Sequence, residues 1–431
     1  MDATFIVVAS VIGAGIFFTP GRVAELLPHP AWIFAAWVSG GLLSLAGALA
    51  NAELGTMFPR AGGNYVFLRE AFHPLAGFLV GWLTFLIVYA GTIAALAAAF
   101  GEGLASQMGW DDAAGLPIAI AVTVAVSLLN YIGVRWGARA NNITSVIKVA
   151  ALLAFVVIGP MVGEGEVGRL FDFGAVGGFS LAAFGLAMSP ILFTYLGWNA
   201  SLYVASEIRD PERNIPRSLF LGLALCAGIY LLMNAVYLYA LPLSELAGVT
   251  DAGQASAVAL FGSYGGGLVA SFVLLSVLGT LNATVLVGPR IAYAMALDGL
   301  FFEGADQVHS VYRTPTVAIG VQAVVSVGLL LLLGNFPSAL DFTTFAILLA
   351  TTADIAALYR LRWRDPDRPR PYRAWGYPVV PALYGLANAA IGAALLWSRP
   401  FECLVGLLML LAGLPFYWVL SRRNAGRSAP D

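Results

Sequence analysis

The sequence predicts an all-α polytopic membrane protein with about twelve transmembrane helices. Three observations support this class. Of the 431 residues, 60% are hydrophobic and only 11% are charged, with a mean hydropathy of +0.84, whereas a soluble domain carries roughly 25% charged residues. Apolar stretches of membrane-spanning length follow one another along the whole chain. Two of these stretches, five helices apart, are interrupted by glycine and proline.

A helix needs about 20 apolar residues to cross a hydrocarbon core of roughly 30 Å. On that measure the predicted spans are approximately 3–27, 31–57, 74–101, 117–134, 142–163, 178–205, 217–241, 264–297, 314–333, 339–360, 378–397 and 402–420. The loops between them are too short for a separate soluble domain. We therefore expect one transmembrane domain over 1–431.

Charges in the loops predict the orientation. Arginines follow the even-numbered spans, as at 209–217 and 360–373, and the opposite loops carry mostly acids. The positive-inside rule then places both termini in the cytoplasm. This placement requires an even number of spans, which favours twelve over eleven or thirteen.

The first span reads VASVIGAGIFFTPG, with Gly13 and Gly15 near its middle and Pro20 shortly after. Unpaired backbone groups in lipid cost several kcal/mol each, so irregular backbone persists only beside protein or a water-filled cavity. The N–H groups freed by such a break favour an anion, and the carbonyls of the preceding half-helix favour a cation. A zwitterionic amino acid carries both charges. The alternative is a face of small residues for helix packing.

The sixth span repeats the pattern in SPILFTYLGWNASLYVASE, which contains Pro190, Gly197 and Asn199. By itself this segment also fits an aromatic core or a proline kink. Interrupted helices at matching positions are typical of inverted-repeat transporters. We expect a first inverted repeat over 3–163, a second over 178–360, and two additional helices over 378–420.

Lys148 is the only lysine in the chain and lies about two turns into the fifth span. An intramembrane cation costs at least about 2.5 kcal/mol on insertion scales. Either the side chain reaches the cytoplasmic interface, or it is a fixed or titratable charge near the break in helix one. Unlike arginine, a desolvated lysine can release its proton.

Three further polar residues fall within the spans. Glu53 lies close to a span end and is interpreted as structural, facing cytoplasmic water. Asn282 and Asp354 are candidates for buried polar groups, and whether these three residues are functional stays open. The arginine-rich loop 360–373 requires no explanation beyond the orientation rule.

Four motifs carry a resemblance to a known family: VIGAGIF, AELGTMFPRAGGNYVFLREAF, FTYLGWNASLYVASEIRDPERNIPRS and LGTLNATVLVGPRIAYAMALDG. They resemble the amino acid–polyamine–organocation superfamily, and most closely the L-type amino acid transporters and their bacterial relatives. The resemblance covers nearly the whole chain. It implies a LeuT-type fold of two inverted five-helix repeats, with helices one and six broken.

The resemblance also implies roles for residues of the two breaks. The substrate carboxylate would meet the N–H groups of Gly13, Ala14, Gly15 and Ile16, where Ala14 replaces the family's serine. The substrate ammonium group would meet the carbonyls of Val11, Phe193 and Leu196.

Further roles follow from the same resemblance. Phe193 matches the aromatic gate residue, Leu196 narrows the side-chain pocket beside Gly197, and Asn199 matches the asparagine after the tryptophan. Asn64 stands where the family carries an acid after Gly-Gly. Lys148 matches the lysine that fills the place of a sodium ion in sodium-independent relatives.

In this fold, Lys148 would lie against the carbonyl end of the first half-helix, near Gly15 and Ile16. A protonated lysine would hold helix one in place without sodium, and loss of the proton would loosen it.

The expected function is secondary active transport of amino acids by alternating access, without sodium and with proton symport or exchange. The absence of an acid in the second break favours neutral, small to medium substrates. The alternatives are a membrane sensor that binds amino acids without transport, and a transporter of cationic amino acids or polyamines. Neither a repeated channel filter nor a placed catalytic pair is present, so we expect neither a channel nor an enzyme.

The expected partners are an amino acid substrate and the lipid bilayer. Net charge is −2, so no nucleic-acid partner is expected. The residue spacing indicates no cofactor and no metal site, and no cysteine is placed for a disulfide-linked subunit. The expected location is the cell membrane, as in a bacterial inner membrane.

Overall fold

The structure is a computed structural model that describes residues 3–60, 62–171, 179–203, 205, 208–302, 304–312 and 314–427; the side chains of 134–142, 145 and 423–427 lie outside the description. Within these ranges all regular structure is helical. The helices, in order, are α1 (Ala3–Val11), α2 (Gly15–Phe18), α3 (Pro20–Leu26), α4 (Pro30–Met57), α5 (Asn64–Ala71), α6 (Pro74–Trp82), η1 (Leu83–Tyr89), α7 (Ala90–Met108), η2 (Asp112–Ala114), α8 (Gly115–Tyr131), α9 (Val134–Val162), η3 (Val167–Leu170), α10 (Leu181–Thr194), α11 (Ala200–Tyr203), α12 (Pro211–Ala240), α13 (Leu243–Leu246), α14 (Ala252–Val287), α15 (Pro289–Leu297), α16 (Thr316–Leu333), α17 (Phe336–Arg364), α18 (Val379–Ser398) and α19 (Pro400–Arg427).

The predicted all-α class with broken first and sixth helices is confirmed. Each predicted span falls on one helix or on consecutive helices. In the described part of the chain, nine helices are long and apolar enough to cross a membrane, or ten if the α1–α3 segment, bent by 54°, counts as one span. The predicted start of the sixth span and of the second repeat, residue 178, lies outside the described residues. The repeat boundaries stay a prediction.

The predicted start of the eighth span, residue 264, agrees with the membrane-length part of α14, although helical structure in α14 already begins at Ala252. Gly262 interrupts it with φ 74° and ψ −176°. That positive φ suits glycine, so a short helix precedes the kink and the membrane-length helix follows it. The shorter helix that begins at Ala252 and ends at this kink was not predicted from the sequence.

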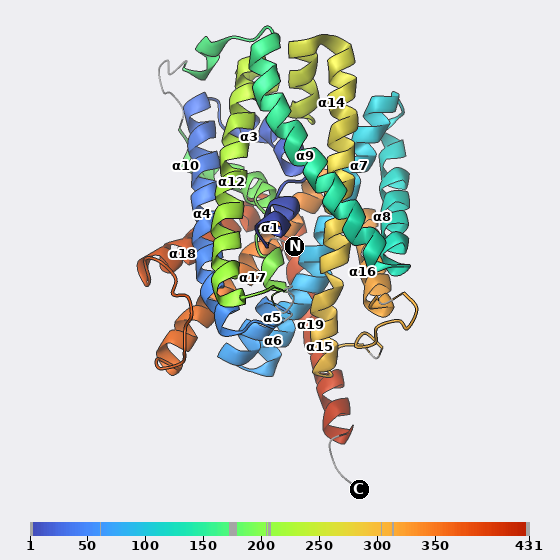
Figure 1. Ribbon diagram of the computed structural model, residues 1–431, viewed down its shortest axis with the longest axis vertical. Helices are drawn as coiled ribbons and strands as arrows, with labels where there is room; N and C mark the ends of the chain where they lie inside the picture. The colour runs from blue at the N-terminus through green and yellow to red at the C-terminus, as the bar shows by residue number, and fades with distance from the viewer. Residues whose placement is uncertain are drawn as a thin grey trace.

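Figure 1 shows how the bundle surrounds the first break. α1 lies near the middle of the molecule and packs against α12 and α14. α4 and α12 run side by side, and α9 crosses α14 obliquely. α17 packs against α7, α10 and α18. The broken helices are therefore enclosed by continuous ones, as irregular backbone in a membrane requires.

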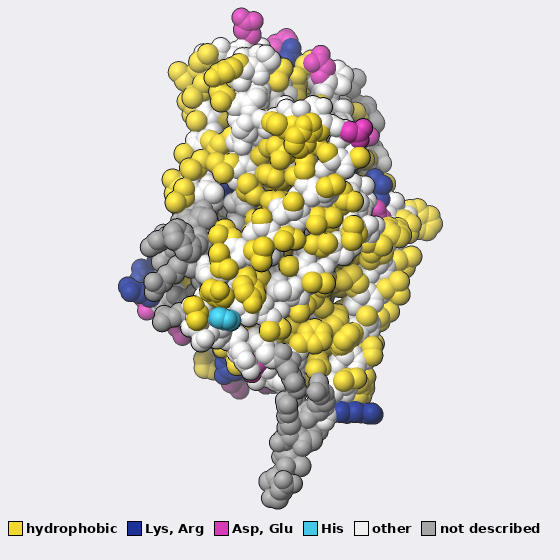
Figure 2. All heavy atoms as spheres, turned by 90° about the vertical axis from the view of Figure 1, so that its right-hand side faces the viewer, with side chains coloured by type: hydrophobic (Ala, Val, Ile, Leu, Met, Phe, Trp, Pro, Cys, Tyr) yellow, Lys and Arg dark blue, Asp and Glu magenta, His cyan; other side chains and the backbone are white. Residues whose placement is uncertain are grey.

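The outer surface fits a lipid environment. Figure 2 shows a broad band of hydrophobic side chains across the middle of one face, with acidic side chains toward its edges. Exposed apolar residues of α8 and α16 include Leu128, Val324 and Leu331. Cys226 and Cys403 are both buried free thiols.

Glu53 does not face water, contrary to the sequence-based interpretation. Its carboxylate is fully buried at the end of α4 and binds both Nε (2.7 Å) and Nη2 (2.6 Å) of Arg362. Arg370 Nε lies 3.2 Å from the same carboxylate, and the Ala374 N–H donates to it at 2.8 Å. The arginine-rich loop therefore does more than set orientation, because it neutralises this acid and fastens the loop after α17 to α4.

We expect Glu53→Gln to destabilise the protein. The substitution leaves Arg362 and Arg370 without their buried counter-charge, and breaking a buried pair by removing one partner costs about 3–5 kcal/mol. The measurement is the melting temperature in detergent. Asp365→Asn, which removes the exposed partner of Arg364, serves as control and should change it little. An unchanged melting temperature for Glu53→Gln would contradict the role given to this cluster.

Candidate functional site

The first break separates α1 from α2. α1 ends at Val11 and α2 begins at Gly15. A Cβ atom on Gly15 would lie 2.4 Å from Thr194 Oγ1 and 2.7 Å from Thr194 Cα, and one on Gly13 would lie 2.9 Å from Thr280 Cγ2. Contacts this short are incompatible with any side chain at Gly15 unless Thr194 moves. Glycine is thus required here by close approach of another backbone.

The second break separates α10 from α11 and touches the first one. α10 ends at Thr194, and α11 begins at Ala200. Gly197, between them, has φ 109°, and a Cβ atom there would lie 2.5 Å from the Ser10 carbonyl oxygen. The two interrupted segments therefore meet backbone against backbone.

Side chains from neighbouring helices hold the two breaks together. Tyr230 of α12 places its hydroxyl 2.8 Å from the Val11 carbonyl oxygen and 3.1 Å from the Thr194 carbonyl oxygen. The hydroxyls of Thr19 and Thr194 lie 2.9 Å apart. Tyr230 thus gives a partner to one carbonyl at the end of α1 and one at the end of α10, as the burial of backbone groups in an apolar medium demands.

Lys148 of α9 reaches the carbonyl end of α1. Its Nζ donates to the carbonyl oxygens of Ala9 (2.7 Å) and Ile12 (2.6 Å) and to Thr280 Oγ1 (3.0 Å). The side chain is fully buried, which rules out that it reaches the interface. A cation at the C-terminal end of a half-helix is favoured by the unpaired carbonyls there.

Lys148 was expected near Gly15 and Ile16, but the carbonyls that it contacts are those of Ala9 and Ile12. The Gly15 carbonyl accepts the N–H (2.9 Å) and the hydroxyl (2.8 Å) of Thr19. The Ile16 carbonyl accepts the hydroxyl of Tyr237 at 3.1 Å. These two residues already belong to the second half-helix, so their carbonyls point along it and away from α1.

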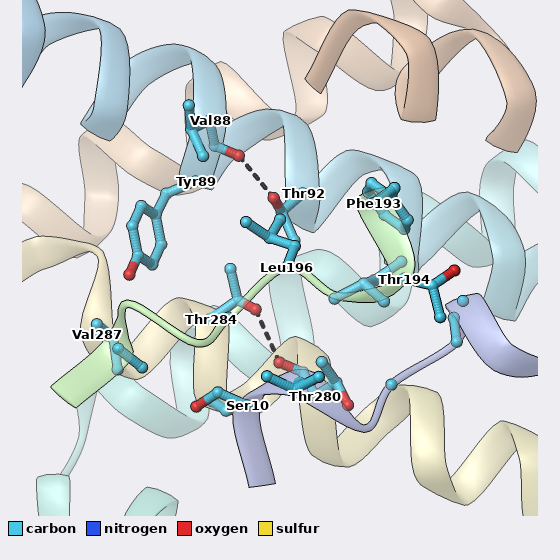
Figure 3. Close-up of a pocket in the computed structure, with 18 of the residues that line it drawn as sticks. Ser10, Val88, Tyr89, Thr92, Phe193, Thr194, Leu196, Thr280, Thr284 and Val287 are labelled. Atoms are coloured by element: carbon cyan, nitrogen blue, oxygen red, sulfur yellow. Dashed lines mark hydrogen bonds between the residues drawn. The ribbon is translucent and has the colours of Figure 1, made fainter. Parts of the chain in front are cut away.

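A cavity opens where the two breaks meet. In Figure 3, the segment after Ser10 and the segment that carries Leu196 approach each other, with Tyr89 and Thr92 on one side and Thr280 and Thr284 on the other. The lining residues are Ser10, Val11, Gly13, Ala14, Gly15, Val88, Tyr89, Thr92, Leu96, Phe193, Thr194, Leu196, Gly197, Asn199, Ala200, Thr280, Ala283, Thr284 and Val287. None of these described lining residues carries a charge.

The cavity offers backbone donors on its α2 side. In the described part of the chain, no backbone carbonyl accepts a hydrogen bond from the N–H groups of residues 13 to 16. These groups lie just before α2 or in its first turn, and three of them belong to residues that line the cavity, Gly13, Ala14 and Gly15. They can therefore meet an anion without breaking an existing backbone bond.

Comparison with known families now adds to this geometry. The family model described as amino acid permease matches residues 1–416. The chain belongs to the amino acid permease family. It is thus a multi-pass membrane protein and an amino acid transporter.

Three relatives of this permease are similar over most of their length. The serine/threonine exchanger SteT of Bacillus subtilis is 31% identical over 98% of this chain and 96% of its own. The human large neutral amino acids transporter small subunit 2 is 30% identical over 97% of this chain and 79% of its own. The human cystine/glutamate transporter is 30% identical over 96% and 83%. All three are named as transporters or exchangers, and none is named as an enzyme.

Most of the residues predicted for the substrate site line the permease's cavity. These are Val11, Gly13, Ala14, Gly15, Phe193, Leu196, Gly197 and Asn199. Ile16 is fully buried, and neither it nor Lys148 is among the lining residues. Ile16 could therefore contribute only through its backbone N–H group. Lys148 would act through its contacts with the end of α1 and not by touching the substrate.

Two of the three carbonyls predicted for the substrate ammonium group already have partners. The Val11 carbonyl accepts from Tyr230 at 2.8 Å. The Phe193 carbonyl accepts the Leu196 N–H at 3.0 Å. The Phe193 ring centroid lies 6.0 Å from that of Phe336, so its side chain closes against α17. An incoming ammonium group would compete with these bonds or share the same oxygens, since a carbonyl has two lone pairs.

The sequence reasoning missed the walls of the cavity on helices η1, α7 and α14. Tyr89, Thr92 and Thr284 line it. Thr92 donates to the Val88 carbonyl (2.7 Å) and Thr284 to the Thr280 carbonyl (2.9 Å). For α14, the four-residue spacing of Thr280 and Thr284 places both on one helix face and could have indicated this wall.

The open polar candidates also have contacts. Asn282 Oδ1 accepts from Asn130 Nδ2 at 2.8 Å. Asp354 Oδ2 accepts from Asn64 Nδ2 at 2.6 Å. Asn64 stands at the position where the family carries an acid. Its contact with Asp354 of α17 could not be predicted from the sequence, because the two residues are 290 apart.

Proposed function

We propose that this permease moves neutral, small to medium amino acids across the cytoplasmic membrane by alternating access, without sodium, as an exchanger or proton symporter. The observation that carries the proposal is the cavity between two broken helices. It is lined by Gly13, Ala14 and Gly15, whose N–H groups donate to no backbone carbonyl in the described part of the chain. Backbone groups recognise the α-carboxylate and α-ammonium groups, which all amino acids share. Charge-free lining walls favour an uncharged substrate side chain.

The position of Lys148 supports transport without sodium. Its Nζ occupies the space between Ala9, Ile12 and Thr280 that three oxygen ligands enclose. An ammonium group there supplies the positive charge that a bound cation would otherwise provide. The names of two relatives support exchange or neutral substrates, since one is a serine/threonine exchanger and another a large neutral amino acids transporter, whereas a third is named for cystine and glutamate.

Orientation belongs to the same proposal. The arginine-rich loops would face the cytoplasm together with both termini, in a bacterial inner membrane. No disulfide-linked subunit is required, because both cysteines are buried inside the bundle.

The test is uptake of labelled alanine, serine, phenylalanine and arginine into proteoliposomes. Sodium is replaced by choline, and the vesicles are loaded with or without unlabelled amino acid. We expect uptake of neutral amino acids in choline, with trans-stimulation if exchange operates. Strict sodium dependence or a preference for arginine would contradict the proposal. Binding without flux would instead favour a sensor.

Leu196 is expected to limit substrate size. It lines the substrate cavity and also a second, smaller cavity bounded by Ser44, Thr344, Tyr384 and other residues of α4, α17 and α18. Leu196→Gly removes the wall between them. We expect the uptake ratio of phenylalanine to alanine to rise by about tenfold or more, the scale at which pocket volume discriminates apolar groups.

The matched control is Leu192→Ala. Leu192 lines the second cavity but not the substrate cavity, so its truncation enlarges the former without joining the two. Its uptake ratio should stay that of the wild type. A ratio that Leu196→Gly leaves unchanged would show that this side chain does not set the size limit.

A further inference from the structure

A carboxyl group of the permease that the transport site does not use lies buried within α17. Asp354 is 1% exposed. Its Oδ2 accepts a hydrogen bond from Asn64 Nδ2 at 2.6 Å, and among the described residues its Oδ1 has no hydrogen-bond partner. An ionised carboxylate inside a membrane domain is costly unless a cation or several donors face it.

Among the described residues, the surroundings of Asp354 offer no such cation. The groups that face it are Asn64 from α5, Asn51 from α4, Tyr203 from α11 and Tyr384 from α18. Asn51 donates its Nδ2 to the Gly47 carbonyl, and its Oδ1 is itself buried without a partner.

Charged residues elsewhere on the packed helices are engaged with other groups. Arg362, about two turns further along α17, is held by Glu53. Glu102 of α7 and Glu402 of α19 lie at the opposite end of α17, where they bind Phe336 N–H and the Ser338 hydroxyl. Helices α10 and α16 contain no titratable residue.

A neutral acid suits this environment better than a carboxylate. Protonated Asp354 has a hydroxyl to donate and needs no counter-charge, whereas its carboxylate would have only the amide groups of Asn51 and Asn64 as donors. Its carbonyl oxygen can still accept from Asn64.

A chain of hydrogen bonds leads from Asp354 to the substrate cavity. Asn64 Oδ1 accepts from the Tyr203 hydroxyl at 2.7 Å, and that hydroxyl accepts from Asn199 Nδ2 at 3.2 Å. Asn199 lines the cavity. The Tyr203 ring also meets the ring of Tyr89, another lining residue, with centroids 5.6 Å apart.

The hydrogen bonds cross from a short half-helix to two other helices, α5 and α17. Tyr203 belongs to α11, the part of the bundle that follows the second break, whereas Asn64 and Asp354 belong to α5 and α17. If α11 moves away, the Tyr203–Asn64 bond breaks, and water can reach a carboxyl group that is now shielded.

We propose that Asp354 is a proton-binding residue of the transport cycle: its neutral form accompanies the arrangement in which α11 is held against α5 and α17, and release of the proton accompanies their separation. The inference rests on the proposed transport function. The proton passes from the carboxyl to water that enters as α11 departs, and it returns from water when α11 closes. Substrate that contacts Asn199 and protonation of Asp354 thereby act on the same half-helix.

The test compares wild type with Asp354→Asn, which keeps the shape and the hydrogen bonds of the neutral acid but cannot ionise. Exchange of labelled serine and leucine is measured in proteoliposomes from pH 5 to 9. We expect the wild-type rate to depend on pH and this dependence to be lost in Asp354→Asn. Infrared spectra of the reconstituted protein should show a protonated carboxylic acid C=O band that the variant lacks.

Two further variants keep the test sharp. Asp365→Asn alters an exposed acid just beyond α17, where hydrogen bonding to Arg364 holds the pKa of the carboxyl below its usual range; both the band and the pH profile should stay those of the wild type. Tyr203→Phe cuts the chain between Asn64 and Asn199 while leaving the acid in place. We expect it to weaken the pH dependence and to retain the infrared band.

The outcomes separate this inference from the proposed function. Serine or leucine exchange with the same pH profile in wild type and Asp354→Asn, or a spectrum without an Asp354 band, would overturn the coupling role alone. An infrared band in a wild-type protein that transports no amino acid would overturn the proposed function, and the coupling role with it. Should Asp354→Asn fail to fold, a wild-type pH profile in Tyr203→Phe would overturn the coupling role.

Discussion

Gly15→Leu is expected to abolish amino acid uptake. A Cβ atom at this position would lie 2.7 Å from the backbone Cα of Thr194, so even the first atom of a side chain forces the two breaks apart. The remaining atoms of leucine would then compete with a substrate carboxylate for the N–H groups of residues 13 to 16. Uptake into proteoliposomes should fall to background. Gly15→Ala, which adds the colliding Cβ alone, should lose most of it.

The effect must be separated from a general intolerance of leucine in the helices. Gly228→Leu is the matched control, because an added Cβ at Gly228 of α12 would meet nothing within 4 Å. It should transport as the wild type does. Both variants need to elute as monodisperse protein in detergent. A folded Gly15→Leu protein with normal uptake would refute the substrate site between the breaks.

The positions of these breaks could be predicted because their cause is local. Glycine at 13, 15 and 197 and proline at 190 weaken a helix wherever they occur, and hydrocarbon makes such weakening costly. The same physics predicted the all-α class. Local sequence could not separate the helix that begins at Ala252 from a loop, because its end is defined by a single kink at Gly262.

Contacts between distant helices were harder to predict. Glu53 was interpreted as facing water because it stands near a span end, yet the loop after α17 folds back and buries it against Arg362 and Arg370. Nothing in the local pattern of α4 encodes that return. Asp354 and Asn64 likewise become neighbours only in the folded bundle.

Lys148 lies between these extremes. Its place within a span left two possibilities open, an interface residue or a charge near the break in helix one. The contact with the carbonyl end of the first half-helix, which the family resemblance implied, is present. The individual carbonyls depend on where α1 stops. Because the last turn of α1 ends at Val11, the oxygens that point out of it are those of Ala9 and Ile12, and not those of residues in α2.

Lys148→Ala is expected to slow transport by at least about tenfold. The substitution removes three hydrogen bonds from a charged donor, and hydrogen bonds of charged groups contribute about 1.5–3 kcal/mol each. The carbonyls of Ala9 and Ile12 would lose their cationic partner, although Thr280 still donates to Ile12 at 3.1 Å. α1 would then be poorly held, and the arrangement that presents the N–H groups of the break would be less populated.

The measurement is uptake into proteoliposomes in choline medium for wild type, Lys148→Ala and Lys148→Met. Methionine restores most of the volume but neither the charge nor the donors. If Lys148 acts through its charge, Lys148→Met should be as slow as Lys148→Ala while its melting temperature stays nearer that of the wild type. If the side chain merely fills space, Lys148→Met should recover uptake. Full activity of Lys148→Ala would contradict this role, because it would show that α1 needs no cation at this position.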